Sequence, residues 1–169
     1  DEQWIMEARQ LSDYALDHYF DDASGMFWYT SDVDPPLIAR KQEMMDNVIP
    51  ASNSMMALNL FRLGTLLDRA HYQKVAKQML LNVVPHIDYG QSFSNWAILH
   101  LYMSHPYFEI AITGEDFDQK RAELASAYLP NSVFLGGRSN LTLPLLEGKV
   151  LDTTTVFVCV DRSCRMPVQ

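Results

Sequence analysis

The sequence is short of three things: long apolar runs, basic side chains and cysteine. No run of about 18 or more apolar residues is present, which argues against a membrane-spanning helix. Lysine and arginine number 13 against 21 aspartates and glutamates, so the formal net charge is −8. Nucleic acids and anionic membranes are bound through a basic face. We therefore expect neither a nucleic acid nor a membrane among the partners of this chain.

The two cysteines are Cys159 and Cys164, too few for a fold that depends on several disulfides. Four residues separate them, whereas a thioredoxin-type redox motif has two between its cysteines. A zinc site would need two further ligands, and the last histidine is His105. Two interpretations stay open: a disulfide across a turn between two extended arms, or two reduced thiols, which a reducing compartment favours.

Motifs for phosphate and metal binding are also missing. The glycines of LGGRS lack the spacing of a phosphate-binding loop, and no two histidines have the spacing of a zinc protease. We therefore expect no metal and no cofactor. The chain begins with Asp1 and runs into DEQWIMEARQL without the basic and apolar regions of a signal peptide. We interpret it as a C-terminal piece of a longer protein, and we favour a cytoplasmic location.

Helical periodicity dominates the first 105 residues. Apolar side chains recur every three or four positions over residues 3–20, 53–67, 70–84 and 91–104. Residues 53–67 are apolar on nearly all sides, so this helix should be buried on more than one face. The connections are short, which favours antiparallel pairing of successive helices.

The character of the sequence changes near Pro106. YFEIAITG alternates and is rich in β-branched residues, and EDFDQKRAELASAYLP has the composition of a helix. SVFLGG and TTTVFVCV are typical of further strands. The sequence therefore predicts helical hairpins over residues 1–105 and a small α/β tail, a βαβ unit plus a strand, over residues 106–169. The fold class we expect is mainly α.

Small polar side chains gather before the most apolar helix, in the stretch DNVIPASNS at residues 46–54. They are Asp46, Asn47, Ser52, Asn53 and Ser54. The last three are all suited to cap a helix, although one cap suffices. The stretch can equally line a ligand site at a helix N-terminus. Glu43 or Asp46 would then be the candidate acid or base. The sequence leaves both uses open.

Several of these stretches together resemble the C-terminal region of the thioredoxin-domain-containing proteins related to spermatogenesis-associated protein 20. The resemblance is carried by MFWYT after a helix, by RKQEMMDNVIPASNSMMALNLFRLG and by HYQKVAKQML. In that family, D-N-x-x-P-S-x-N-S opens an apolar helix, and the matching residues here are Asp46, Asn47, Pro50, Ser52 (after Ala51), Asn53 and Ser54. The endings FEIAITGEDFD, YLPNSVFL and TVFVCVDRSCRMPV, with their paired cysteines, are also similar.

This resemblance implies an N-terminal thioredoxin-like domain, which this chain lacks. It also implies an (α/α)6 toroid of the six-hairpin glycosidase type, similar to N-acylglucosamine 2-epimerases. The chain would then hold the last hairpins of the toroid and an α/β appendage. Helices that lost their neighbours should leave apolar surface at residues 4–20 or 55–67, so we expect self-association.

Two functions follow as hypotheses. One is a carbohydrate-binding or sugar-modifying domain, with the polar residues at 46–54 as ligand contacts. The other is a non-catalytic scaffold or partner-binding domain that supports a thioredoxin-like redox module. An unpaired Asp46 on a concave surface favours the first hypothesis, and complete internal hydrogen bonding of the stretch favours the second.

Overall fold

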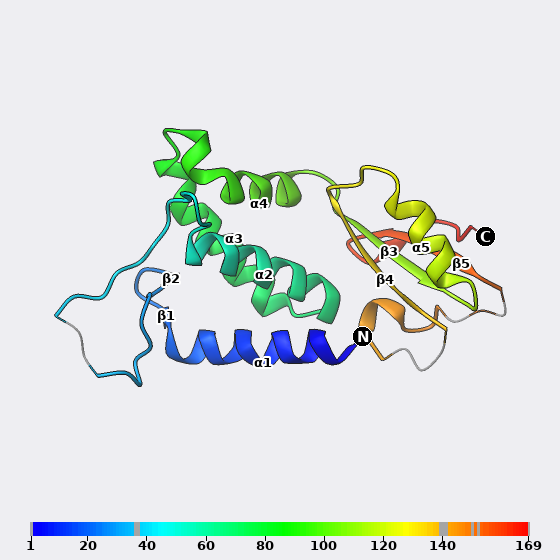
Figure 1. Ribbon diagram of the computed structural model, residues 1–169, viewed down its shortest axis with the longest axis horizontal. Coiled ribbons are helices and arrows are strands. Elements are labelled where there is room, and N and C mark those ends of the chain that lie inside the picture. The colour runs from blue at the N-terminus through cyan, green and yellow to red at the C-terminus, as the bar shows by residue number, and fades with distance from the viewer. Residues whose placement is uncertain (1, 36–37, 139–141, 150, 152, 169) are drawn as a thin grey trace. The chain divides into compact units, whose positions relative to one another are not determined.

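The computed structural model describes residues 2–35, 38–138, 142–149, 151 and 153–168. In this part of the chain there are five α-helices and two β-sheets, one of two strands and one of four (Figure 1). The chain divides into two compact units, Asp1–Gly64 with Arg69–His100 and Thr65–Asp68 with Leu101–Gln169. None of the described helices is long and apolar enough to cross a membrane.

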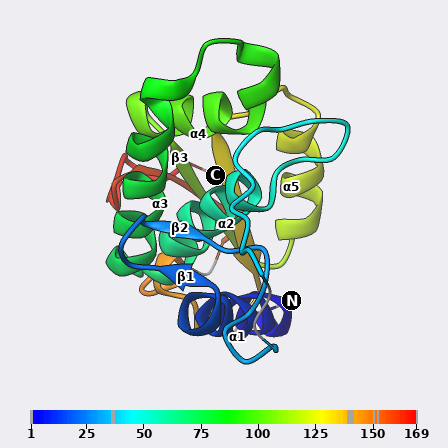
Figure 2. The ribbon, with the colours of Figure 1, turned by 90° about the vertical axis from the view of Figure 1, so that its left-hand side faces the viewer.

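The first unit is mainly helical. Its helices, two of which extend a few residues into the second unit, are α1 (Glu2–His18), α2 (Ser52–Leu67), α3 (Ala70–Val83) and α4 (Ser94–Ser104). After α1 the chain forms a short antiparallel hairpin of β1 (Phe20–Asp21) and β2 (Met26–Phe27), seen in Figure 2. Gly25 in its turn has a φ of 66°, a conformation that suits glycine because it lacks a Cβ.

The core of this unit is built from the apolar stripes that the periodicity predicts. Leu60 of α2, Met79 of α3 and Trp96 of α4 are all fully buried. Tyr72 of α3 is also buried, and its hydroxyl donates a hydrogen bond to the carboxylate of Asp13 in α1. Burial raises the pKa of Tyr72, and the bond to Asp13 raises it further, so the phenol stays a donor at neutral pH.

The second unit contains a four-stranded sheet. Its strands are β3 (Phe108–Thr113), β4 (Ser132–Gly137), β5 (Thr155–Val160) and β6 (Ser163–Cys164), in the order β4-β3-β5-β6. β3 pairs in parallel with β4 and antiparallel with β5. Helix α5 (Phe117–Ala125) connects β3 to β4, as a parallel pair requires. The βαβ unit expected after Pro106 is therefore present.

Both faces of this sheet are covered. On one face Ile110, Ile112 and Val156 form a buried cluster, and Phe117 and Leu124 of α5 pack against it. Thr113 alternates with those isoleucines along β3, and its hydroxyl donates a hydrogen bond of 2.6 Å to the carbonyl oxygen of Lys149. Leu145 and Leu146, just before that lysine, are buried.

The expected fold class is wrong. The chain is about 48% helical and carries two sheets, so it is a mixed α/β protein and not a mainly α fragment of an (α/α)6 toroid. Local periodicity located the helices and the main strands, but the toroid came only from the resemblance. The sheet has a buried cluster of its own, and the α/β region belongs to a compact unit.

Candidate functional site

The fold places the carboxylate of Asp46 at the centre of the 46–54 stretch. Only 6% of this residue is exposed. Its Oδ1 accepts hydrogen bonds from the backbone N–H of Ala51 at 3.0 Å and from the hydroxyl of Ser54 at 2.6 Å. Its Oδ2 accepts the backbone N–H of Asn95 at 2.9 Å. One side chain therefore joins the loop before α2, the first turn of α2 and the first turn of α4.

These hydrogen bonds determine the ionisation of Asp46. Burial by itself would raise its pKa, but the bonds from Ser54, Asn95 and Ala51 outweigh burial and hold the pKa below its ordinary value. The group is thus a fixed anion whose two oxygens already accept hydrogen bonds. A general base must instead have a basic oxygen within reach of a substrate proton. In this arrangement Asp46 acts as a cap for the two helices.

Asn53 makes a second set of internal bonds. The residue is fully buried, and its Oδ1 accepts the backbone N–H of Phe27 at 2.8 Å. Its Nδ2 donates to the carbonyl oxygens of Phe27 at 2.9 Å and of Glu43 at 3.0 Å. The first turn of α2 is therefore tied to strand β2 and to the loop that precedes Asp46.

The other residues of the predicted site lie nearer the surface. Asn47 is exposed, and its Oδ1 accepts the backbone N–H of Val48 at 2.8 Å. Ser52 is also exposed, and its backbone N lies 3.5 Å from Oε2 of the half-buried Glu43. The stretch thus divides into a buried, mutually bonded group (Asp46, Asn53 and Ser54) and two surface residues.

An open hollow of about 510 Å³ adjoins this loop. It is lined by Lys41, Gln42, Glu43, Met44, Met45, Asp46, Asn47 and Ser92. Its two carboxylates are those of Glu43 and Asp46, the candidate acid or base residues of the sequence. Because both oxygens of Asp46 accept internal hydrogen bonds, Glu43 is the one of the two that is placed to meet a ligand in this hollow.

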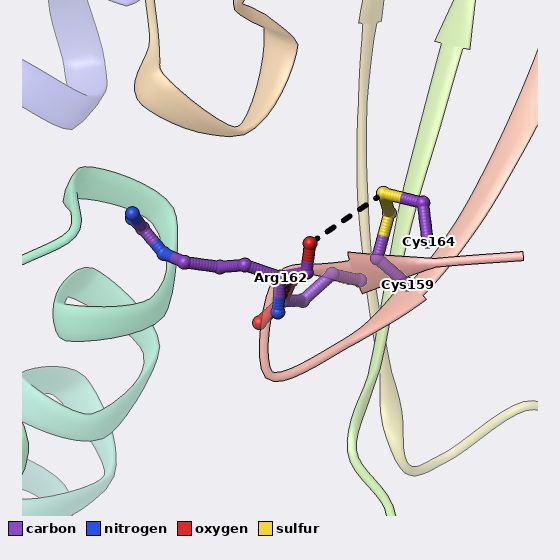
Figure 3. Close-up of a disulfide and its surroundings, with 4 residues drawn as sticks. Cys159, Arg162 and Cys164 are labelled. Atoms are coloured by element: carbon purple, nitrogen blue, oxygen red, sulfur yellow. Dashed lines mark hydrogen bonds between the residues drawn. A yellow bond between two sulfur atoms is a disulfide. The ribbon is translucent and has the colours of Figure 1, made fainter.

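The two cysteines form a second cluster with a residue that sequence reasoning missed. Cys159 and Cys164 are directly paired between β5 and β6, and their sulfurs are bonded at 2.05 Å (Figure 3). Glu109 of β3 pairs with Cys159 from the other side, and its Oε2 accepts the backbone N–H of Arg162 at 3.2 Å. Burial raises the pKa of Glu109, and the Arg162 N–H and charge oppose this only in part.

Glu109 was missed because YFEIAITG looks like a strand with its polar residues toward solvent. No signal in the sequence marks it, because a place between Phe108 and Ile110 also suits a solvent-facing residue, and the burial of Glu109 comes from what packs over the sheet. Among the described residues, no group of three or more histidines, cysteines, aspartates or glutamates is arranged to hold a metal ion.

No protein-family model matches the chain, and no curated protein matches it.

Asn53→Ala should lower the free energy of unfolding by about 3 kcal/mol, because it leaves the buried backbone groups of Phe27 and the carbonyl of Glu43 without their partner. Asn47→Ala is the matched control, since the same side chain is removed from an exposed position six residues away. It should change stability by less than about 0.5 kcal/mol. Urea denaturation of the two variants checks this, and equal losses would contradict it.

Asp46→Asn should destabilise the protein at neutral pH and much less in acid. The pKa of Asp46 is lower in the folded chain than in the unfolded chain. Its ionised form therefore stabilises the fold above the unfolded pKa, about 3.9, and this contribution is lost as the pH falls through the folded pKa. The difference in melting temperature between wild type and variant, measured from pH 7 to pH 3, should narrow once the pH falls below about 3.9. A constant difference would show that ionisation of Asp46 is irrelevant.

Proposed function

We propose that this chain is a non-catalytic, partner-binding domain. The observation that carries the proposal is the complete internal hydrogen bonding of Asp46 and Asn53, the side chains that an enzymatic reading would place in contact with substrate. Buried polar groups that already have partners contribute to the definition of one structure and offer little to a ligand. The polar stretch therefore holds the neighbouring loop in one conformation, and the side chains that this loop exposes make the contact with the partner.

The surface in question is formed by Met45, Val48 and Ile49, which we call the 45–49 surface. Their exposed fractions are 57%, 96% and 78%. Apolar side chains so exposed on neighbouring positions of a loop are a feature of interaction sites. Two side chains hold the backbone just before this surface in place. Trp96 donates a hydrogen bond to the carbonyl oxygen of Met44, and Asn53 donates one to the carbonyl oxygen of Glu43.

The fixed loop conformation matters for affinity. The backbone N–H of Asp46 also donates to the carbonyl oxygen of Ser92 at 2.7 Å, so the loop is held between α2 and the turn before α4. A loop that is ordered before binding loses less conformational entropy when the partner arrives. The three apolar side chains are thus presented on a preorganised backbone.

The partner we propose is a thioredoxin-like module. The resemblance to thioredoxin-domain-containing proteins supports this choice, since it implies such a module beside a chain of this kind. A second copy of the chain is a poorer partner for the 45–49 surface, because like net charges of −8 disfavour the approach of two copies through this surface.

A purified thioredoxin-like domain titrated against this chain should show saturable binding by calorimetry. Replacing Val48 and Ile49 together by serine should weaken it roughly tenfold or more, because apolar contacts at the centre of an interface dominate its affinity. Melting temperature should not change, since both positions are exposed.

The control is Tyr128→Ser, which removes an exposed aromatic side chain from the second unit. Its dissociation constant should equal that of the wild type. Absence of binding, or equal binding by the double serine variant, would refute the 45–49 surface as the site for this partner.

A sugar-binding function is the second candidate, and the hollow beside Glu43 is the observation that favours it. Its volume falls in the range of small-molecule sites. The proposed partner-binding function instead predicts that no sugar or sugar phosphate raises the melting temperature, because only a ligand that prefers the native state does so. A rise that is lost in Glu43→Gln and kept in the exposed control Glu115→Gln would reverse the choice.

A further inference from the structure

The two cysteines joined by the Cys159–Cys164 bond differ in exposure. Cys159 lies in β5 and is fully buried, whereas Cys164 lies in the exposed edge strand β6. A thiolate breaks a disulfide by attacking one of its sulfurs directly, so access decides which sulfur is attacked. Of the two residues, Cys164 is the exposed one and so the one placed for such an attack.

The turn that the disulfide closes has an unfavourable backbone. Asp161 and Arg162 connect β5 to β6, and their φ angles are 47° and 65°. Both are left-handed conformations, which glycine adopts freely and a residue with a Cβ adopts at a cost. Two such residues in succession are held in place by the disulfide and by the bond from the Arg162 N–H to Glu109.

The neighbourhood of Cys164 also suits the reduced state. Its sulfur lies 3.8 Å from the backbone carbonyl oxygen of Arg162, the contact dashed in Figure 3. A disulfide sulfur has no proton, so this contact is no hydrogen bond while the bond is intact. After reduction the Cys164 thiol gains a proton, and this carbonyl is a ready acceptor for it.

We propose that Cys159–Cys164 is a reversible thiol–disulfide exchange site that accepts two electrons from a dithiol through the Cys164 sulfur. One thiolate of the dithiol attacks Cys164 Sγ, which forms a mixed disulfide and releases Cys159 as a thiolate. The second thiol of the dithiol then displaces Cys164. The dithiol leaves as a disulfide, and its two thiol protons end on the two cysteine sulfurs.

Reduction alters the edge of the sheet. Beyond β6 the chain stays paired with β5 through Arg165 N–H to Val158 O and through reciprocal bonds between Val156 and Val168. Once the covalent bond is broken, noncovalent contacts alone hold the turn in its left-handed conformation: the pairing of β5 with β6, the bonds just named, the Glu109 contact and the ion pair of Arg162 with Asp68. The exchange site therefore controls how firmly residues 163–168 hold the edge of β5. It lies within the second unit and does not involve the 45–49 surface.

The first test removes the cost of the left-handed φ angle at Arg162. Arg162→Gly and Arg162→Ala both delete the side chain and its ion pair with Asp68, but only glycine removes the cost of the left-handed φ. Titration of each folded variant with dithiothreitol, followed by alkylation and mass spectrometry, gives the half-reduction point. The glycine variant should need roughly tenfold more dithiothreitol than the alanine variant. Equal half-reduction points would overturn the proposal.

The attacked sulfur is tested with single-cysteine variants. Cys159→Ser leaves the Cys164 thiol and Cys164→Ser leaves the Cys159 thiol, and each reacts with an aromatic disulfide reagent under native conditions. The Cys164 thiol should react at least about tenfold faster, in line with its exposure. Equal rates, or a wild-type disulfide that dithiothreitol reduces only in denaturant, would overturn the assignment. Both measurements are independent of any partner at the 45–49 surface.

Discussion

The helical unit depends on one buried anion. The carboxylate of Asp46 accepts three hydrogen bonds, two from the start of α2 (Ala51 and Ser54) and one from the start of α4 (Asn95). Backbone N–H groups in a first helical turn have no partner within the helix, and an anion there also interacts favourably with the helix dipole. Without this side chain, two helix starts and a loop would each need another way to satisfy their amides.

The same arrangement explains why the polar stretch looks like an active site. Acid, amide and hydroxyl side chains gathered at a helix start are what a catalytic pocket needs, and they are also what a buried junction of three backbones needs. The two uses differ in where the lone pairs and protons point. At Asp46 and Asn53 they point inward to backbone groups, so the surface chemistry of this region is left to apolar side chains and to Glu43.

Sequence reasoning succeeded where the controlling interactions are local. α2, α3 and the strands β3 to β5 follow from periodicity and composition, because their residues face a core at regular intervals. It could not find the bond from Asn95 to Asp46, whose partners are 49 positions apart. Nor could it show that Glu109 would be covered, because burial of a strand residue depends on what packs over the sheet. The prediction of a toroid was wrong for a related reason: the similarity of short segments to a family does not show how those segments pack against one another.

The arrangement of the sheet has a consequence for the order of folding. β3 pairs with both β4 and β5. Phe108 of β3 pairs with Ser132 of β4, whereas Glu109 pairs with Cys159 of β5, a separation along the chain that is about twice as long. Closing the longer loop costs more chain entropy, so the β3–α5–β4 segment should assemble first and receive β5 afterwards. The β5–β6 hairpin closes the shortest loop of all, over residues 161 and 162, so it brings its two cysteines together without waiting for β3 or β4. The disulfide is in this sense a local bond within one hairpin, and its formation does not require the rest of the sheet.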